Sequence, residues 1–137
     1  MNDFMTSIKI AGSGLNAQTA RMRVIAENMA NADSAGHTPE EDPYRRKVPT
    51  FHAVLNRELG ATEVTVGALA TDMSDFSSRY EPGHPAADEN GYVKYPNVNT
   101  LIETMDMREA QRTYEANLNV VTVSRQMLGR TLDILRG

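Results

Sequence analysis

The stretch YEANLNVVTVSRQMLGRTLDIL, residues 114 to 135, predicts the fold because its large apolar residues recur at alternating intervals of four and three. Such spacing places side chains on one side of an α-helix and is typical of a coiled-coil seam, the line along which two helices pack. Arg125 is the polar member of the series, and its aliphatic stem can pack while its guanidinium reaches water. The apolar members are Tyr114, Leu118, Val121, Leu128, Leu132 and Leu135.

A second seam is predicted near the other end of the chain, from about Phe4 to Asn31. Gly12 and Gly14 lie within it, and each lowers helix stability by about 1 kcal/mol relative to alanine. The segment is therefore either one helix with a weak point, which we favour, or two helices with Ser13 capping the second. Every seventh position of this seam is a large apolar residue, namely Ile8, Leu15, Met22 and Met29.

The region between the two seams has a different composition, since residues 33–96 hold all 6 prolines. Short runs typical of β-strands occur at residues 46–54, 63–66 and 92–95. Pro96 stands just before the second helix, whose N-cap is expected to be Asn97 or Asn99. We therefore expect a mainly α fold in which long N- and C-terminal helices pair as an antiparallel coiled-coil-like hairpin. Its segments are an N-terminal helix (1–32), a small irregular β- and turn-rich middle (33–96) and a C-terminal helix (97–137).

Composition and charge exclude several classes of protein. The formal net charge is −4, whereas binding to the nucleic-acid backbone usually requires a basic face, so no nucleic-acid partner is expected. The chain has no cysteine, which removes disulfides, thiolate nucleophiles and cysteine-ligated metals. The densest basic run, Arg45–Lys47, lies close to the acidic run Glu40–Asp42, and we interpret the pair as a solvated loop.

Targeting and membrane signals are weak in this sequence. The first residues are acidic and lack the basic start and continuous apolar run of a cleaved signal peptide. No apolar run approaches the roughly 20 residues needed to span a bilayer. We therefore expect neither a cleaved signal peptide nor direct insertion into a membrane.

The stretch YEPGHPAADENGYVKYPNVNT, residues 80 to 100, resembles a catalytic loop in composition but fits no chemical template. An EF-hand register on Gly91 lacks the required Asp and Glu at the loop ends. The three histidines, His37, His52 and His84, do not form a zinc-binding spacing, and nucleophile and phosphate-loop motifs are missing. We expect no catalytic, cofactor or metal site, and interpret the stretch as a turn, a strand and a helix start that orient the C-terminal helix.

Four motifs in the same order carry a resemblance to a known family. They are AENMANADS (26–34), PYRRKVPTF (43–51), the stretch 80–100 and EAQRTYEANLNVV (109–121). Together they resemble bacterial flagellar basal-body rod proteins, and the resemblance covers nearly the whole chain. Residues 33–44, DSAGHTPEEDPY, depart from the shorter linker common in other rod and hook proteins. The positions matched to the family signature are Asn28, Asn31, Tyr80, Pro82, Gly83, Asn90, Gly91, Pro96, Asn97 and Asn117.

The resemblance implies a structural subunit of the flagellar rod that assembles by helix packing into the axial shaft transmitting torque. Implied partners are other copies of the chain, proximal and distal rod subunits, the rod–membrane ring adaptor and the flagellar type III export apparatus. The implied location is the periplasm-spanning rod of the basal body, reached without a cleaved signal peptide. An alternative is a cytoplasmic helical adaptor or chaperone that binds amphipathic helices of a partner.

Two of the signature asparagines admit two roles each at this point. Asn28 and Asn31 either cap carbonyls at the helix end or contact a neighbouring subunit. We expect Asn117 to lie on the seam and to set the register of the paired helices, as a buried polar residue does in coiled coils.

Overall fold

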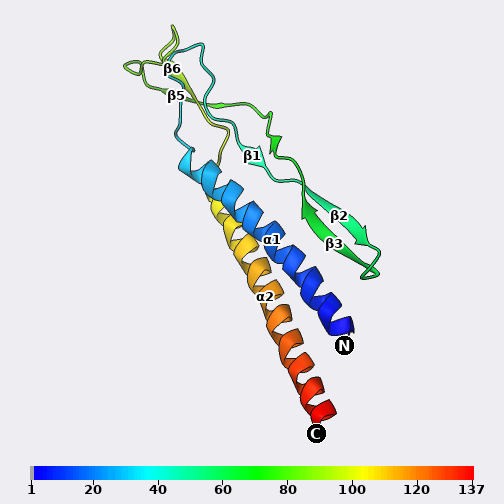
Figure 1. Ribbon diagram of the computed structural model, residues 1–137. Helices are drawn as coiled ribbons and strands as arrows, with labels where there is room; N and C mark the ends of the chain where they lie inside the picture. The colour runs from blue at the N-terminus through cyan, green and yellow to red at the C-terminus, as the bar shows by residue number, and fades with distance from the viewer. Residues whose placement is uncertain (1) are drawn as a thin grey trace. The chain divides into compact units, whose positions relative to one another are not determined.

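The computed structural model describes residues 2–137 and contains two long helices joined by a region of short strands (Figure 1). Helix α1 covers Asn2–Ala30 and helix α2 covers Thr100–Arg136. The expected mainly helical fold with a small β-rich middle is therefore confirmed. Helix α1 runs unbroken through both glycines, and the Ser13 hydroxyl donates to the Ile10 carbonyl at 2.7 Å within it.

The chain divides into two compact units, and each helix contributes residues to both. Unit 1 contains the chain up to Met22 together with Pro49–Ala68 and Arg108–Gly137. Unit 2 contains Arg23–Val48 and Leu69–Met107. The three segments expected from the sequence follow secondary structure instead, and that division remains a prediction.

Unit 1 carries an antiparallel hairpin of strands β2 (Phe51–Asn56) and β3 (Ala61–Val66). Phe51 pairs with Val66 at the open end, and Gly60 takes a φ of 64° in the turn, a left-handed conformation that favours glycine. The backbone N–H of Val64 donates to the Ser13 hydroxyl at 3.2 Å, which ties the hairpin to α1. The strand expected over residues 46–54 is in fact two strands, β1 (Lys47–Val48) and β2. Pro49 lies between them along the chain and has no N–H to donate to a neighbouring strand.

The buried face of α1 lies one residue before the predicted seam. One line of this face alternates by three and four through Ala11, Gly14, Gln18, Arg21, Ile25 and Asn28, which are buried or half-buried. The predicted series runs through the residues that directly follow these. Ala17 and Val24, two residues before the seam, are also buried. One residue turns a helix by about 100°, so the most buried side chains lie beside the predicted seam. Of its large apolar members, Ile8, Leu15 and Met22 are half-buried and Met29 is exposed.

Helix α2 shows a related shift at half of its seam positions. Tyr114, Val121 and Leu128 are half-buried as one line of the observed face. The other line consists of Glu103, Ala110, Asn117, Ser124 and Thr131, in place of the larger residues Leu118 and Leu132, which are exposed. The face of α2 that is covered within the chain is therefore half small or polar.

Two contacts fix the direction of the helices within unit 1. A Cβ atom added at Gly14 would lie 2.7 Å from Asn117 Nδ2, so the Asn117 amide rests against the glycine backbone. Arg21, later in α1, forms a 3.4 Å ion pair with Glu109, which is earlier in α2. The two helix segments of unit 1 therefore run antiparallel.

Unit 2 contains two further antiparallel strand pairs. Strand β1 (Lys47–Val48) pairs with β4 (Ala70–Thr71), and β5 (Ser77–Tyr80) pairs with β6 (Tyr92–Tyr95). Strand β6 alternates exposed and buried residues, and its buried members join a small apolar cluster. This cluster contains Ala86, Val93 and Tyr95, with Ala35 and Ala87 packed against it.

The stretch 80–100 folds as a turn, a strand and a helix start. The Asp88 carboxylate accepts the backbone N–H groups of Asn90 and Tyr92, both at 2.9 Å. Gly91 follows with a φ of 84°, and a Cβ there would also come within 2.8 Å of the Tyr80 ring. Glycine is thus required at this position both by its conformation and by the space available.

Candidate functional site

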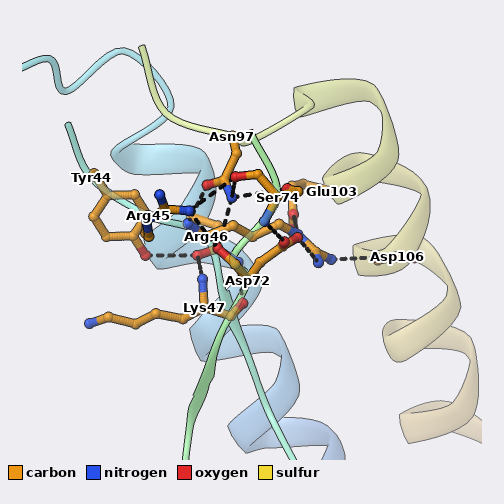
Figure 2. Close-up of polar contacts among 10 residues, drawn as sticks. Tyr44, Arg45, Arg46, Lys47, Asp72, Ser74, Asn97, Glu103 and Asp106 are labelled. Carbon is orange, nitrogen blue, oxygen red and sulfur yellow. Dashed lines mark hydrogen bonds and ion pairs between the residues drawn. The ribbon is translucent and has the colours of Figure 1, made fainter. Parts of the chain in front are cut away.

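The most densely bonded part of the described chain is a set of polar side chains in unit 2, here called the polar node (Figure 2). Its members come from the end of α1, strand β1 and the residues before it, the turn after β4, and the start of α2. They are Asn28, Tyr44, Arg45, Arg46, Lys47, Asp72, Ser74, Asn97, Glu103 and Asp106.

Asn28 joins α1 to strand β1 through its side-chain amide. Its Nδ2 donates to the Lys47 carbonyl at 2.8 Å, and its Oδ1 accepts the Lys47 backbone N–H at 3.0 Å. The same Oδ1 accepts the Tyr44 hydroxyl at 2.7 Å. The amide therefore acts as a strand partner for one residue of β1, which requires one donor and one acceptor on the same buried side chain.

Two titratable groups beside this amide, Tyr44 and Lys47, have pKa values that their surroundings raise. Burial raises the pKa of Tyr44, and the nearby Glu27 carboxylate adds to the effect. Lys47 donates from Nζ to Glu27 at 2.7 Å, and this bond raises the pKa of the lysine. Tyr44 is thus held as a neutral hydroxyl donor.

Arg46 binds three carboxylates with its three guanidinium nitrogens. Its Nε donates to Glu103, while Nη1 and Nη2 reach Asp72 at 3.4 Å and Asp106 at 3.6 Å. The Glu103 side chain is only 1% exposed, and its hydrogen bond raises the pKa of Arg46. Arg46 therefore connects strand β1 to the start of α2 through a bond shielded from water.

Asn97 links Arg46, the residue before β1, to the turn after β4. Its Oδ1 accepts the Arg46 backbone N–H at 2.8 Å, and its Nδ2 donates to the Asp72 carbonyl at 2.9 Å. Asn99 is instead the N-cap of α2, accepting the Leu101 N–H at 3.0 Å. Of the two N-cap candidates, the structure therefore selects Asn99.

Asp72 is held as a carboxylate by its own turn. The Ser74 backbone N–H donates to it at 2.8 Å, and this bond, with those from the Ser74 hydroxyl and Arg46, lowers the pKa of Asp72. The carboxylate thus carries its charge beside Arg46 at neutral pH.

The hydrogen bonds and ion pairs of the polar node connect α1, the chain around β1 and the start of α2. Among the buried side-chain atoms of the node, Glu103 Oε2 is the one without a hydrogen-bond partner in the described residues. Across residues 2–137 no group of three or more His, Asp or Glu side chains is arranged to hold a metal ion. In the same part of the chain no helix is long and apolar enough to cross a membrane.

The expectation that Arg45–Lys47 forms a solvated loop is wrong. Arg46 is mostly covered and ion-paired, and the Arg45 guanidinium lies 4.0 Å from the centre of the Phe76 ring. Sequence spacing gives no direct sign of these partners, because Asp72 and Glu103 are far away along the chain. One signal for Glu103 was available, because it lies seven residues before Ala110 and fourteen before Asn117 and so falls on the same side of the helix.

The predicted packing residues fall into two groups in the isolated chain. One group is exposed, and the other is half-buried. Exposed are Met29, Leu118, Leu132 and Leu135; half-buried are Ile8, Leu15, Met22, Tyr114, Val121 and Leu128. The contacts of these residues with other subunits remain a prediction.

The signature residues at the end of α1 differ in role. Asn31 bonds at the helix terminus, donating to the Glu27 carbonyl at 2.9 Å and accepting the Ser34 hydroxyl at 3.1 Å. Asn28 instead contacts β1 within its own chain. Among the later positions, Gly91 and Pro96 are buried, Asn97 and Asn117 are half-buried, and Tyr80, Pro82, Gly83 and Asn90 are exposed.

Comparison with known proteins connects this arrangement to a family. Residues 8–38 match the family model described as flagella basal body rod protein. Residues 89–134 match the model described as the C-terminal part of the flagellar basal body rod FlgEFG proteins.

Curated relatives match along nearly the whole chain. The flagellar basal-body rod protein FlgC of Agrobacterium fabrum is 51% identical over 136 residues, which cover 99% of this chain and 98% of the relative. FlgC of Aquifex aeolicus is 37% identical, covering 97% of this chain and 98% of the relative. FlgC of Salmonella typhimurium is 39% identical, covering 91% and 92%.

Proposed function

The chain belongs to the FlgC family of flagellar basal-body rod proteins, and from this premise we propose how its helices build the shaft. It is a structural subunit of the rod and not an enzyme. We place it in the proximal, periplasm-spanning part, beside other rod subunits and the rod–membrane ring adaptor. In this proposal it is delivered by the flagellar type III export apparatus without a cleaved signal peptide.

The observation that carries the proposal is that part of the apolar stripe of α2 lies outside the face that is buried within the chain. Contacts within the chain use Ala11, Gly14, Ala110 and Asn117, which are small or polar. The stripe residues Leu118, Leu132 and Leu135 of α2 remain exposed to solvent, Leu118 at 45%. Exposed apolar stripes of this length on paired helices are surfaces for further helices.

We propose that α1 and α2 pair along the small-residue face as an antiparallel, coiled-coil-like hairpin. The Gly14–Asn117 and Arg21–Glu109 contacts support this direction and register in unit 1. The apolar stripes then pack against neighbouring subunits in the shaft. In dilute solution unit 1 is expected to be weakly ordered, because small residues bury little apolar area.

In this proposal the polar node fixes the ends of the two helices within unit 2. It holds the end of α1 and the start of α2 to the same strands within unit 2. Membership in the rod family argues against the alternative of a cytoplasmic adaptor or chaperone.

Basal bodies purified from cells with Leu118→Asp test the proposal. Leu118 is exposed in the single chain, so the charge should leave the circular dichroism of the purified protein unchanged. In the assembled shaft the same charge would be buried without a partner, which is strongly unfavourable. We expect loss of swimming and of the chain from basal bodies, while the neighbouring change Asn119→Asp preserves both.

A fully motile Leu118→Asp strain would show that this stripe faces no neighbour. The unmodified chain in the cytosolic fraction and not in basal bodies would contradict the rod assignment itself. Hydrogen exchange of the dilute chain checks the order of unit 1, where full protection of both helix segments would contradict the weak ordering.

A further inference from the structure

The start of α2 presents an apolar ridge that nothing in unit 2 covers. Leu101 is 67% exposed, Ile102 50% and Met105 62%. Positions three and four apart lie on the same side of a helix, so the three side chains form one continuous surface. Water around a surface of this kind is released when another apolar surface covers it.

The ridge borders a group of carboxylates that lacks enough positive charge. Glu103, Asp72 and Asp106 share the single guanidinium of Arg46, so three negative charges meet one positive charge. Each of the three guanidinium nitrogens already faces one of them. The Asp106 and Asp72 side chains are partly open to solvent. A second cation bound there would balance the excess negative charge of the three carboxylates.

A hollow of about 260 Å³ joins the ridge to these carboxylates. Ile102 from the ridge lines it together with Glu103 and Asp72. Glu103, which is 1% exposed, has an Oε2 atom that is buried without a hydrogen-bond partner among the described residues. Buried acceptors are nearly always satisfied by a protein donor or ordered water, so this atom can accept one further donor.

We propose that this surface, the α2 ridge site, receives the basic C-terminal helix end of a neighbouring rod protein of different sequence. The required chemistry is an apolar residue with an arginine or lysine one turn away. The end of α2 itself has this pattern, with the 79% exposed Ile134 four residues after Arg130. Residues 89–134 match the model described as the C-terminal part of FlgEFG rod proteins, so we expect a neighbouring rod protein to have a related C-terminal segment.

A different rod protein fits better than a second copy of this chain. A helix end docking on the ridge site of an identical copy makes a head-to-tail contact that repeats without closing. Repeated head-to-tail contacts between identical copies would extend the assembly without limit, whereas a subunit restricted to the proximal part of the shaft forms an assembly of limited length. This choice of partner rests on the proposed function.

A photo-crosslinking residue placed at Met105 tests the partner directly in assembled basal bodies. The expected adduct is a C-terminal helical peptide of another rod protein, with an arginine or lysine within one turn of an apolar residue. The same probe at the exposed Thr38 should not give this peptide. An adduct with a second copy, an adduct with a peptide lacking a cation, or no adduct in motile cells would overturn the proposal.

Charge reversal tests the electrostatic part. Asp106→Lys should reduce the amount of the chain in basal bodies at least tenfold, whereas Glu40→Lys, an exposed reversal elsewhere in unit 2, should not. Changing the cation of the crosslinked partner peptide to glutamate should restore assembly of Asp106→Lys. A local folding defect could not be rescued from the partner, so failure of rescue counts against the site.

The two proposals fail in different ways. If the chain is not a rod subunit, the unmodified protein is missing from basal bodies. If only the ridge site is wrong, the unmodified protein is present and the Met105 probe gives none of the expected peptide.

Discussion

Replacing Gly14 by alanine tests the register of the two helices in unit 1. The new Cβ would lie 2.7 Å from Asn117 Nδ2, whereas ordinary contacts begin at 3.4 Å, so the amide would have to retreat by about 0.7 Å. Overpacking of this kind costs about 1–3 kcal/mol. Alanine also gains about 1 kcal/mol of helix propensity. The net expectation is a loss of stability between about 0 and 2 kcal/mol.

Gly12→Ala is the matched control, because no atom lies within 4 Å of a Cβ at that position. It should gain the full propensity difference of about 1 kcal/mol, which raises the Tm by roughly 3–5 °C for a chain of this size. The double change Gly14→Ala with Asn117→Ala removes the obstacle and should recover most of that gain. The three variants together isolate the contact between Gly14 and Asn117.

Urea unfolding of the full chain, followed by circular dichroism at 222 nm, measures these differences. Trimethylamine N-oxide can be added to all samples to favour the folded helices. The Gly12→Ala gain shows that α1 is folded under the conditions used. A Gly14→Ala variant stabilised as much as Gly12→Ala would refute the register, because Asn117 would then not lie against Gly14.

The remaining predictions concern the polar node. Arg46→Met leaves Glu103 buried without its cation and should destabilise unit 2 by about 3–5 kcal/mol in urea unfolding. The double change Arg46→Met with Glu103→Leu should recover most of this loss. Equal losses in the single and the double variant would contradict the reasoning. Asn28→Asp removes the donor to the Lys47 carbonyl and should lower the stability of unit 2 by about 1–3 kcal/mol in urea unfolding. An unchanged unfolding midpoint would count against the amide bridge. Because burial raises the pKa of Tyr44, its stabilising contribution is complete below the unfolded pKa of about 10 and is lost as pH rises through the folded value. Circular dichroism and tyrosine absorbance at alkaline pH should show this loss in the parent and not in Tyr44→Phe.

Local signals in the sequence were sufficient for both helices and for part of the strands. The apolar periodicity found both helices, and the Asn90–Gly91 turn with the alternation after it found strand β6. Strands β4 and β5 were missed, because Ala70–Thr71 is too short and Ser77–Tyr80 too polar to show a pattern. Their pairing depends on partners far away in the chain.

The buried face of the helices could not be predicted from periodicity alone. Periodicity locates the most apolar stripe, and in an isolated chain that stripe is normally buried. Here Ala11 and Ala110 are buried while Leu118 is exposed. A pattern optimised for packing among several chains does not reveal which of its faces is closed within one of them.

The polar node was hidden for a different reason. Arg46, Asp72 and Glu103 are ordinary charged residues in their local context, and only the fold brings them together. Asn28 was found as part of a motif, but its partner is a backbone segment that no side-chain pattern can indicate.

The exposed stripes of α2 have a consequence for the temperature dependence of assembly. Burial of Leu118 and its neighbours would release ordered water, so association should be driven by entropy near room temperature and carry a negative heat-capacity change. Such a driving force weakens on cooling. The hydrogen bonds of the polar node within each subunit do not weaken on cooling in this way. Chilled shafts should therefore come apart between subunits while unit 2 of each subunit stays folded.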